Sequence, residues 1–383
     1  MRILQLVQTP QRRGAEIFAY QLSQRFINDG HEVRTAYLYP SFADNNLPLR
    51  NGDLIIGRKE NHFSETLPGW NIAILRKLAA MIRSFQPEIV QVNAGRTVKY
   101  GALLRYLTNG KWRLIYRNIG DPSVWLATAW HRWIYRVLLI PKIDGIVAVS
   151  SQSLNVLRCF YGEGKRMINI PRAVDADYFI PKINREMVRE KLRTPPDARV
   201  MIFVGSLTFE KRIERLLKVL EISRSKIPQL HFWILGEGPL RQKLEAEALK
   251  LGVGDAVRFI GSQEDVASFV NAADLLVLSS DTEGIPGVVL EAALLEVPSV
   301  ACASGGTPDC IVQGETGVLV ESKDEIKFAA VVSELIMQPE KRSEMGRRAK
   351  AWVQSRFAME TVSAQYLRFY REVLDASNNG KSN

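Results

Sequence analysis

The sequence predicts an α/β protein made of two doubly wound domains, each with a parallel sheet covered by helices. Three observations support this prediction. The chain has 383 residues, which suits two domains of about 150–200 residues better than one core. Its 46% hydrophobic and 24% charged residues are typical of globular proteins. Short apolar segments alternate with amphipathic ones along most of the chain, as in parallel sheets with crossover helices.

In the first half, apolar runs predict strands and amphipathic runs predict the helices between them. The first strand is expected at residues 2–7, and the helix after it, at 15–28, is stopped by Asp29-Gly30. The other elements are expected as strands at 32–37, 54–56, 89–92, 114–116 and 145–149 and helices at about 70–85 and 97–108. The first domain is expected to cover residues 1–180.

A segment with three prolines and a strongly charged helix, residues 181–199, is predicted to be the linker. A second alternating series follows it and defines a domain expected at 181–359. Strands are expected at 200–204, 230–235, 257–260, 275–278, 299–301 and 317–319, with helices at 212–225, 239–250, 265–272, 287–296 and from 324 onward. A last helix at about 360–378 is expected to pack back on the first domain.

The net charge of +10 is concentrated in the first half of the chain. Residues 1–180 contain 24 Lys and Arg against 13 Asp and Glu, whereas the remainder contains 27 against 28. Such one-sided charge indicates an acidic partner: a phospholipid surface, a phosphate-bearing acceptor or nucleic acid. A general solubility bias is the alternative. Nucleic acid is disfavoured because the chain has no recognisable RNA- or DNA-binding motif.

Residues 124–140 add a second indication of a membrane partner. This helix-length segment contains Trp125, Trp130 and Trp133, interleaved with arginines. The pattern fits a helix in a membrane interface or, equally, a buried core helix. The start of the chain is unlike a secretory signal, and no apolar run reaches the roughly 20 residues that cross a bilayer. We therefore expect a cytoplasmic protein with peripheral attachment to the inner face of the cytoplasmic membrane.

Candidate functional residues of the second half follow its predicted strands, where doubly wound folds bind ligands. Gly205 and Ser206 follow the first strand, and Lys211 stands near a helix start, where a phosphate would also meet backbone amides. Gly236 and Gly238 form a glycine turn after the second strand. Glu291 lies in a largely apolar helix, where a carboxylate is costly to bury unless it is hydrogen-bonded.

Together these segments resemble a known family. Glu283-Gly-Ile-Pro-Gly-Val-Val-Leu-Glu291 matches the Glu-x7-Glu motif of retaining glycosyltransferases of family 4. Residues 304–320 are similar to the family's Gly-Gly-x-Pro-Glu stretch and the segment after it, and Arg13-Gly-Ala-Glu16 resembles its N-terminal Gly-Gly-Ala-Glu loop. The resemblance spans about residues 1–360. It implies the GT-B fold, in which two Rossmann-like domains face each other across a cleft, the first binding the acceptor and the second the nucleotide sugar.

The resemblance also implies roles for the matching residues. Glu291 would bind the ribose hydroxyls of the donor, and Glu283 would hold the hydroxyls of the sugar. Lys211 would neutralise the leaving diphosphate, where negative charge develops as the glycosidic bond breaks. The amides of Gly287 and Val288 would lie near the same phosphates. The glycine of the N-terminal loop, Gly14, would let that loop approach the phosphate across the cleft.

The sequence departs from the family pattern at two places. Ser206 stands where the family usually has an arginine, and Arg212 is the candidate replacement for that cation. The family's histidine after an N-terminal strand is also missing. Asn118 is the best positional match, with Arg117 and Asp121 as further candidates.

No metal is expected to take part. Asp175-Ala-Asp177 formally matches a metal-binding Asp-x-Asp motif, but it lies in a segment that resembles the family's Pro-Asn-Gly-Val-Asp stretch. Two carboxylates alone make a poor Mg²⁺ site. The resemblance implies that the lysine and the helix ends neutralise the phosphates instead.

The resulting functional prediction is transfer of a sugar from a nucleotide-diphosphate donor to a hydroxyl of a glycan or lipid-linked acceptor, with retention and without a covalent intermediate. A UDP-sugar is favoured, with GDP- and ADP-sugars open. Bacterial cell-surface polysaccharide or lipopolysaccharide synthesis is the expected setting. The alternative is a nucleotide-sugar-binding pseudoenzyme or assembly partner in a glycan-making complex, which Ser206 and the missing histidine favour.

Overall fold

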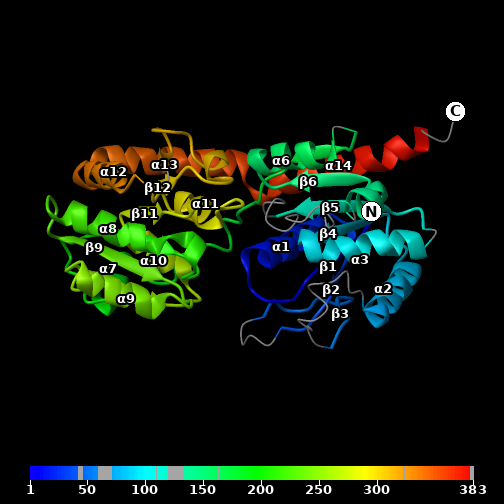
Figure 1. Cartoon of the computed structure of the whole chain (residues 1–383), viewed down its shortest axis with the longest axis horizontal. Helices are drawn as coiled ribbons and strands as arrows, with labels where there is room; N and C mark the ends of the chain where they lie inside the picture. The colour runs from blue at the N-terminus through cyan, green and yellow to red at the C-terminus, as the bar shows by residue number, and fades with distance from the viewer. Residues whose placement is uncertain are drawn as a thin grey trace. The chain divides into compact units, whose positions relative to one another are not determined.

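The computed structural model describes residues 1–383 except 42–45, 59–70, 109, 120–132, 134, 163, 322–323 and 380–383. The chain forms two compact units (Figure 1). The N-terminal unit contains Met1–Ala173 and Met359–Asn383, and the C-terminal unit contains Val174–Ala358. The division after Ala173 falls earlier than the boundary expected after residue 180, because Val174 pairs with Ala358 in a parallel bridge and packs into the core of the C-terminal unit.

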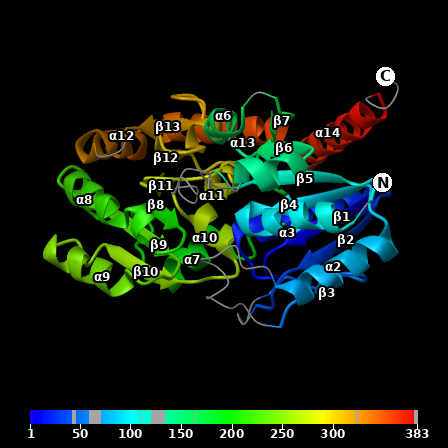
Figure 2. The same ribbon diagram turned by 45° about the vertical axis from the view of Figure 1, so that its right-hand side comes forward.

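The N-terminal unit contains a seven-stranded parallel sheet in the order β3-β2-β1-β4-β5-β6-β7, which can be followed in Figure 2. Its strands are β1 Arg2–Val7, β2 Glu32–Tyr37, β3 Leu54–Ile55, β4 Ile89–Asn93, β5 Arg113–Asn118, β6 Gly145–Ala148 and β7 Met167–Asn169. Its described helices are α1 Gly14–Asn28, α2 Ile72–Phe85, α3 Ala94–Leu107, the π-helix η2 Tyr135–Leu139, the 3₁₀-helix η3 Ile140–Lys142, α6 Ser151–Tyr161 and α14 Met359–Asn379.

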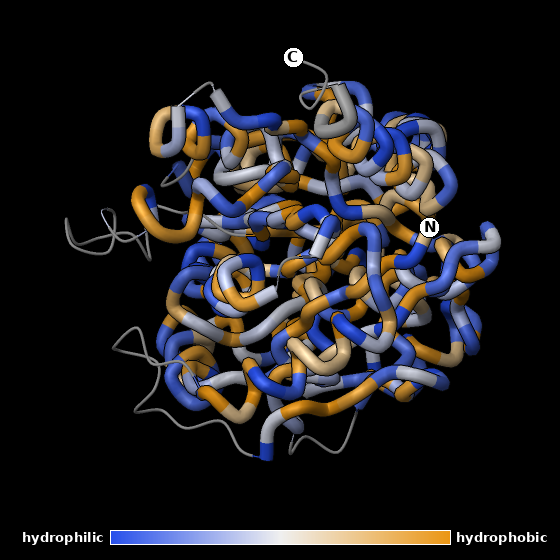
Figure 3. Tube along the Cα trace, turned by 90° about the vertical axis from the view of Figure 1, so that its right-hand side faces the viewer, coloured by the Kyte–Doolittle hydropathy of each residue, from blue (hydrophilic) through white to orange (hydrophobic). Residues whose placement is uncertain are grey.

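Both faces of this sheet are buried, which explains why most positions of its strands are apolar. Ile3 and Ile89 point to the face that α1 and α14 cover, and their neighbours Leu4 and Val90 point to the face of α2 and α3. Successive side chains of a strand alternate between faces, so each strand contributes to both cores. Hydrophobic and hydrophilic residues alternate along much of the tube in Figure 3, as expected where elements have one buried and one exposed side.

The C-terminal unit repeats this architecture with six parallel strands in the order β10-β9-β8-β11-β12-β13. These strands are β8 Arg199–Val204, β9 Leu230–Leu235, β10 Val257–Gly261, β11 Leu275–Leu278, β12 Ser299–Cys302 and β13 Gly317–Val320. The described helices are α7 Arg185–Lys191, η4 Phe209–Lys211, α8 Ile213–Arg224, α9 Arg241–Lys250, α10 Val266–Ala272, α11 Gly287–Leu294, η5 Thr307–Asp309, α12 Glu325–Met337 and α13 Pro339–Arg356. The predicted class of two doubly wound α/β domains is confirmed.

The segment predicted as a linker is instead an integral part of the C-terminal unit. Helix α7 packs on α10, and Val188 is completely buried. Arg185 and Arg189 donate hydrogen bonds to the two carboxylate oxygens of Asp274, at 2.8 and 3.1 Å. The charges that made the segment look solvent-exposed therefore neutralise a buried aspartate. Such ion pairs join residues more than eighty positions apart, so the sequence pattern could not reveal them.

Candidate functional site

The predicted donor-binding residues follow neighbouring strands at the point where the strand order of the C-terminal unit reverses. Strands β8 and β11 pair side by side, with β9 beyond one and β12 beyond the other. In open parallel sheets, ligands bind outside the carboxyl ends of the strands at this switch point, because the adjoining loops diverge there. Lys211 lies in the loop after β8, and Glu283 lies in the loop after β11.

The backbones of the loops after β8 and β9 are in direct contact. The amide of Leu207 donates to the carbonyl of Glu237 at 3.0 Å. Gly236 has a φ of 141°, and a Cβ atom there would lie 2.0 Å from the carbonyl oxygen of Gly205. A Cβ atom at Gly238 would lie 2.5 Å from the carbonyl oxygen of Leu207. Any side chain would push the two loops apart, so Gly236 and Gly238 shape this edge of the sheet through their lack of one.

The loops after β11 and β12 are joined in the same way, and they fix the backbone of Glu283. The Ser304 hydroxyl donates to the carbonyl of Ser280 at 2.7 Å. The amide of Gly306 donates to the carbonyl of Glu283 at 3.1 Å. Gly305, at φ 57°, lies so close that a Cβ atom there would approach this same carbonyl oxygen to 1.9 Å.

The side chain of Glu283 is held by two donors. Its Oε1 accepts hydrogen bonds from Lys211 Nζ at 2.6 Å and from the Ser280 hydroxyl at 2.7 Å. The side chains of Lys211 and Glu283 are 22% and 11% exposed, so a ligand can reach both. The Ser279 hydroxyl donates to the carbonyls of Lys211 and Arg212, which ties the two loops together beneath this pair. The structure thus brings a cation and a carboxylate together at the switch point.

Arg212 points its guanidinium group at a different carboxylate. It lies in the left-handed conformation, with φ 51°, between η4 and α8. Its Nε donates to Asp281 at 2.5 Å, and its guanidinium carbon lies 3.6 Å from the centre of the Phe209 ring. Burial alone would raise the pKa of Asp281, but hydrogen bonds from Arg212 and Arg215 outweigh it and lower that pKa. Arg212 could replace the missing family arginine only by breaking these contacts, so that role stays a prediction.

Helix α11 begins at the same edge of the sheet and carries the remaining predicted donor contacts. Its first residue, Gly287, is buried and follows Pro286. The first amides of a helix have no partner within the helix and lie at the positive end of its dipole, which suits an anion. Glu291 is four residues further on, so it lies on the same face of the helix about 6 Å along the axis. It is half-buried, between the buried side chains of Leu290 and Ala292.

In the N-terminal unit, Asn118 and Gly14 lie at the carboxyl edge of the other sheet. Asn118 ends β5 and is only 1% exposed. Its Oδ1 accepts from the Tyr116 hydroxyl, and its Nδ2 donates to the Ser153 hydroxyl, both at 2.7 Å. Gly14 is the first residue of α1, and a Cβ atom there would lie 3.0 Å from Arg172 Nη1.

Two further structural observations concern metals and membranes. Among the residues that the structure describes, no group of three or more His, Cys, Asp or Glu side chains could hold a metal ion. The same residues include no helix long and apolar enough to cross a bilayer. Asp121, Trp125 and Trp130 lie outside the described residues.

The comparisons with known proteins assign the family. Residues 12–178 match the family model for Glycosyltransferase Family 4, and residues 184–352 match the model for glycosyl transferases group 1. The chain belongs to the family 4 glycosyltransferases. The two matches divide almost where the two structural units divide, so each unit of this glycosyltransferase corresponds to one of the family's two halves.

Three curated relatives show where this glycosyltransferase stands in the family. It is 31% identical to the lipopolysaccharide core biosynthesis glycosyltransferase LpsE of Rhizobium meliloti over 179 residues. These residues are 47% of this chain and 52% of LpsE. It is 26% identical to the N-acetyl-alpha-D-glucosaminyl L-malate synthase of Bacillus anthracis, over 63% of each chain. It is 28% identical to the putative glycosyltransferase EpsD of Bacillus subtilis, over 82% of this chain and 84% of EpsD. The chain thus spans from about half to most of the length of these relatives.

Solved structures confirm the GT-B fold. The complex of Anabaena HepE with UDP-glucose matches with a TM-score of 0.79 at 18% identity, over 98% of this chain and 100% of HepE. The sucrose-phosphate synthase of Thermosynechococcus elongatus matches with a TM-score of 0.82 at 20% identity, over 98% and 99% of the two chains. At these identities the likeness supports the fold, and the substrates have to be argued from the site.

Proposed function

We propose that this glycosyltransferase moves a sugar, with retention, from a nucleotide-diphosphate donor to a hydroxyl of a glycan or lipid-linked acceptor. The observation that carries the proposal is the convergence of Lys211, Glu283 and the start of α11 at the switch point of the C-terminal sheet. A UDP-sugar donor is favoured, since HepE binds UDP-glucose on the same fold. Cell-surface polysaccharide or lipopolysaccharide synthesis is the proposed setting, in line with the roles of LpsE.

In this proposal, the C-terminal unit holds the donor and stabilises its leaving group. Lys211 and the N-terminal amides of α11 neutralise the diphosphate as the glycosidic bond breaks. Glu283 accepts hydrogen bonds from the sugar hydroxyls, and Glu291 accepts them from the ribose. Ser280 is a positioning residue, since its hydroxyl fixes Glu283 Oε1. The acceptor is assigned to the N-terminal unit, where hydrogen bonds with Tyr116 and Ser153 hold Asn118 at the end of β5.

UDP is expected to raise the melting temperature of the protein. A ligand that binds only the folded state stabilises it by about 2.7 kcal/mol at a hundredfold excess over its Kd. The measurement is a thermal-shift titration with UDP, GDP and ADP, each with and without EDTA. The shift with UDP is expected to be largest and unchanged by EDTA, as metal-independent binding requires. If no nucleoside diphosphate shifts the transition, the donor site is wrongly placed.

Catalysis is proposed over a purely binding role. Both family models that match the chain describe glycosyltransferases. The Lys211–Glu283 ion pair that the proposed reaction needs is formed in the structure. Slow hydrolysis of a UDP-sugar by the isolated protein separates the two possibilities. Binding of UDP without hydrolysis or transfer of any donor would support the pseudoenzyme alternative.

Peripheral attachment to an anionic membrane is proposed for an apolar patch on the N-terminal unit. The patch consists of the exposed side chains of Tyr106, Leu107, Trp133, Val137 and Leu138. The Tyr106 hydroxyl donates to the carbonyl of Leu138 at 3.0 Å, which joins the end of α3 to η2. Lys142 Nζ lies 4.2 Å from the centre of the Tyr106 ring, so positive charge borders the patch. Apolar side chains with basic residues beside them suit an interface with anionic lipids.

The protein is expected to co-sediment with vesicles that contain phosphatidylglycerol at low salt and to be released as the salt concentration rises. Salt screens the electrostatic attraction, and the screening length is about 10 Å at 0.1 M ionic strength. Replacing Val137 and Leu138 by aspartate should abolish sedimentation. Leu249 and Ile326, which are exposed apolar side chains of the C-terminal unit, provide the control when both are replaced by aspartate. Equal sedimentation of the two variants would contradict attachment through the patch.

A further inference from the structure

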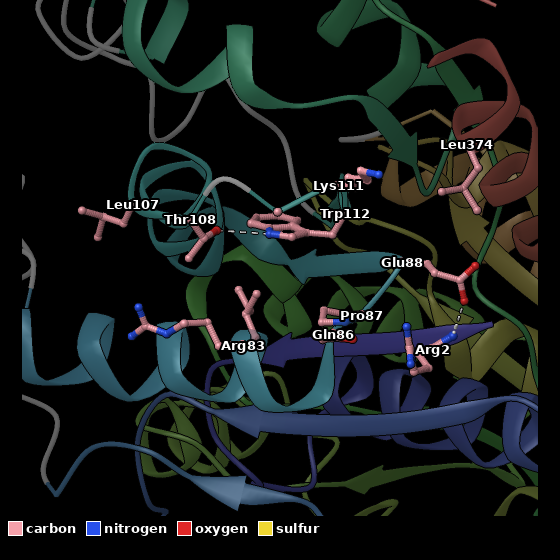
Figure 4. Close-up of a pocket in the computed structure, with 12 residues that line it drawn as sticks. Arg2, Arg83, Gln86, Pro87, Glu88, Leu107, Thr108, Lys111, Trp112 and Leu374 are labelled. Carbon is pink, nitrogen blue, oxygen red and sulfur yellow. Dashed lines mark hydrogen bonds between the residues drawn. The ribbon is translucent and has the colours of Figure 1, made fainter. Parts of the chain in front are cut away.

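A cavity of about 570 Å³ opens at the amino edge of the N-terminal sheet (Figure 4). It lies among the starts of three strands: Arg2 begins β1, Glu88 precedes β4 and Trp112 precedes β5. The last turn of α2, the end of α3 and Leu374 of α14 complete its walls. Its volume lies within the roughly 300–1,000 Å³ of pockets that hold small ligands.

This cavity is separate from the candidate donor and acceptor positions. Parallel strands begin at one edge of a sheet and end at the other, and β1 has six residues. At about 3.3 Å per residue, its two ends are roughly 16–20 Å apart. Gly14 and Asn118 lie at the carboxyl edge, so a ligand in the cavity would be remote from them. Of the residues that line the cavity, only Leu107 has a role above, in the apolar patch proposed for membrane attachment.

Cations outnumber carboxylates in its lining. Arg2, Arg83 and Lys111 form no ion pair within the part of the chain that the structure describes. The carboxylate in the lining, that of Glu88, accepts a hydrogen bond from the backbone amide of Arg2 at 2.8 Å. Nearby, by contrast, Arg105 and Arg113 both pair with Asp144, at 3.6 and 3.4 Å. The protein thus compensates the basic residues beside the cavity and leaves those that line it available to an anion.

The cavity also has a rigid aromatic wall. Trp112 is 2% exposed, and its Nε1 donates to the Thr108 hydroxyl at 3.2 Å. Gly110 lies directly against the ring, since a Cβ atom there would be 2.3 Å from Trp112 Cδ1. In Figure 4, Arg83 lies toward the Leu107 end of the cavity, Arg2 lies beside Glu88 at the other end, and Trp112 lies between. An elongated ligand with an anionic group and a carbon skeleton fits this arrangement.

We propose that the cavity binds a phosphate ester, whose phosphate is attracted by the excess positive charge of the lining and whose carbon skeleton contacts Trp112, Leu107 and Leu374. A phosphate monoester carries close to two negative charges, which suits a lining in which three cations are opposed by one carboxylate. The ester is either the head of a lipid or a soluble phosphorylated compound. The inference goes beyond the proposed transfer reaction and does not depend on it.

Calorimetric titration at low salt tests the proposal with three probes: glycerol 3-phosphate, monomeric dihexanoyl phosphatidic acid and dihexanoyl phosphatidylcholine. Wild-type protein is expected to bind the phosphate monoesters and not the zwitterionic lipid. The variant Arg83→Glu with Lys111→Glu should bind them at least about tenfold more weakly. The substitutions remove charged hydrogen-bond donors and replace two positive charges of the lining by negative ones. Tighter binding of phosphatidic acid than of glycerol 3-phosphate would identify the natural ligand as a lipid. Equal binding of the two would identify it as a soluble phosphate ester.

A matched control separates the cavity from the general charge of the protein. Arg158 lies in the last turn of α6 as Arg83 does in that of α2, and Lys226 precedes β9 as Lys111 precedes β5. Arg158→Glu with Lys226→Glu therefore makes the same change in net charge and in helix-dipole interaction. This control should bind like wild type. Equal weakening in both variants, or no binding of either monoester by folded wild-type protein, would overturn the proposal.

Discussion

Lys211→Ala is expected to lower kcat for donor hydrolysis and sugar transfer about 10²–10³-fold, the usual loss when one donor to a developing charge is removed. Negative charge grows on the leaving phosphate only as the bond breaks, so the donor KM should change far less than kcat. In the structure, Lys211 Nζ is held 2.6 Å from Glu283 Oε1 yet remains partly exposed. The cation is therefore positioned before the reaction and reachable by the donor. Steady-state release of UDP from a UDP-sugar measures the effect.

Two further variants separate charge neutralisation from a structural role of Lys211. Lys218, exposed on the adjoining helix α8, is the matched control, and Lys218→Ala should leave kcat unchanged. Removing Lys211 also leaves the Ser280 hydroxyl as the remaining hydrogen-bond donor to the Glu283 side chain among the residues that the structure describes. If unpairing of Glu283 caused the loss, Ser280→Ala, which also removes a hydrogen bond to Glu283, would lower kcat as much as Lys211→Ala does. We expect a smaller loss in Ser280→Ala, and wild-type kcat in Lys211→Ala would contradict the assigned role.

Most strands of the fold could be predicted because both faces of each sheet are buried, which makes each strand a short apolar run. Strand β7, at Met167–Asn169, was missed because its three residues are only half-buried at the sheet edge and carry no such pattern. The charged helix α7 was mistaken for a linker because its partner, Asp274, lies more than eighty residues away. A sequence pattern reports the local environment of a segment and not its distant partners.

The candidate site shows the same division. The spacing of Lys211, Glu283 and Glu291 after predicted strands was enough to expect them at one edge, because strand order and the parallel arrangement bring those ends together. The direction of each side chain was not predictable. Arg212 has a left-handed backbone at the start of α8, and its side chain pairs with Asp281, whereas that of Lys211 pairs with Glu283. The buried Asn118 accepts a hydrogen bond from Tyr116 and donates one to Ser153, which lies in a later helix.

Glu291→Ala is expected to raise the KM for the donor about 10²-fold while kcat at saturating donor falls much less. A carboxylate that accepts two ribose hydroxyls loses two charge-assisted hydrogen bonds, each worth about 1.5–3 kcal/mol before the cost of rearrangement. The ribose does not change during the reaction, so its contacts stabilise the bound donor and the transition state alike. Lys211 and Glu291 variants should therefore differ in which kinetic constant they change. In the thermal-shift titration, UDP should lose its effect on Glu291→Ala and retain most of it on Lys211→Ala.

The half-buried position of Glu291 in an apolar helix requires a control for folding. Glu291→Gln keeps the volume and one acceptor oxygen, so it should fold like wild type and show an intermediate KM. Glu221→Ala removes an exposed carboxylate from α8 and should change neither constant. If Glu291→Gln and Glu291→Ala are both folded and bind UDP as tightly as wild type, the carboxylate does not contact the ribose. Its place one turn from the start of α11 would then serve helix packing, and the nucleoside would have to lie elsewhere along this edge.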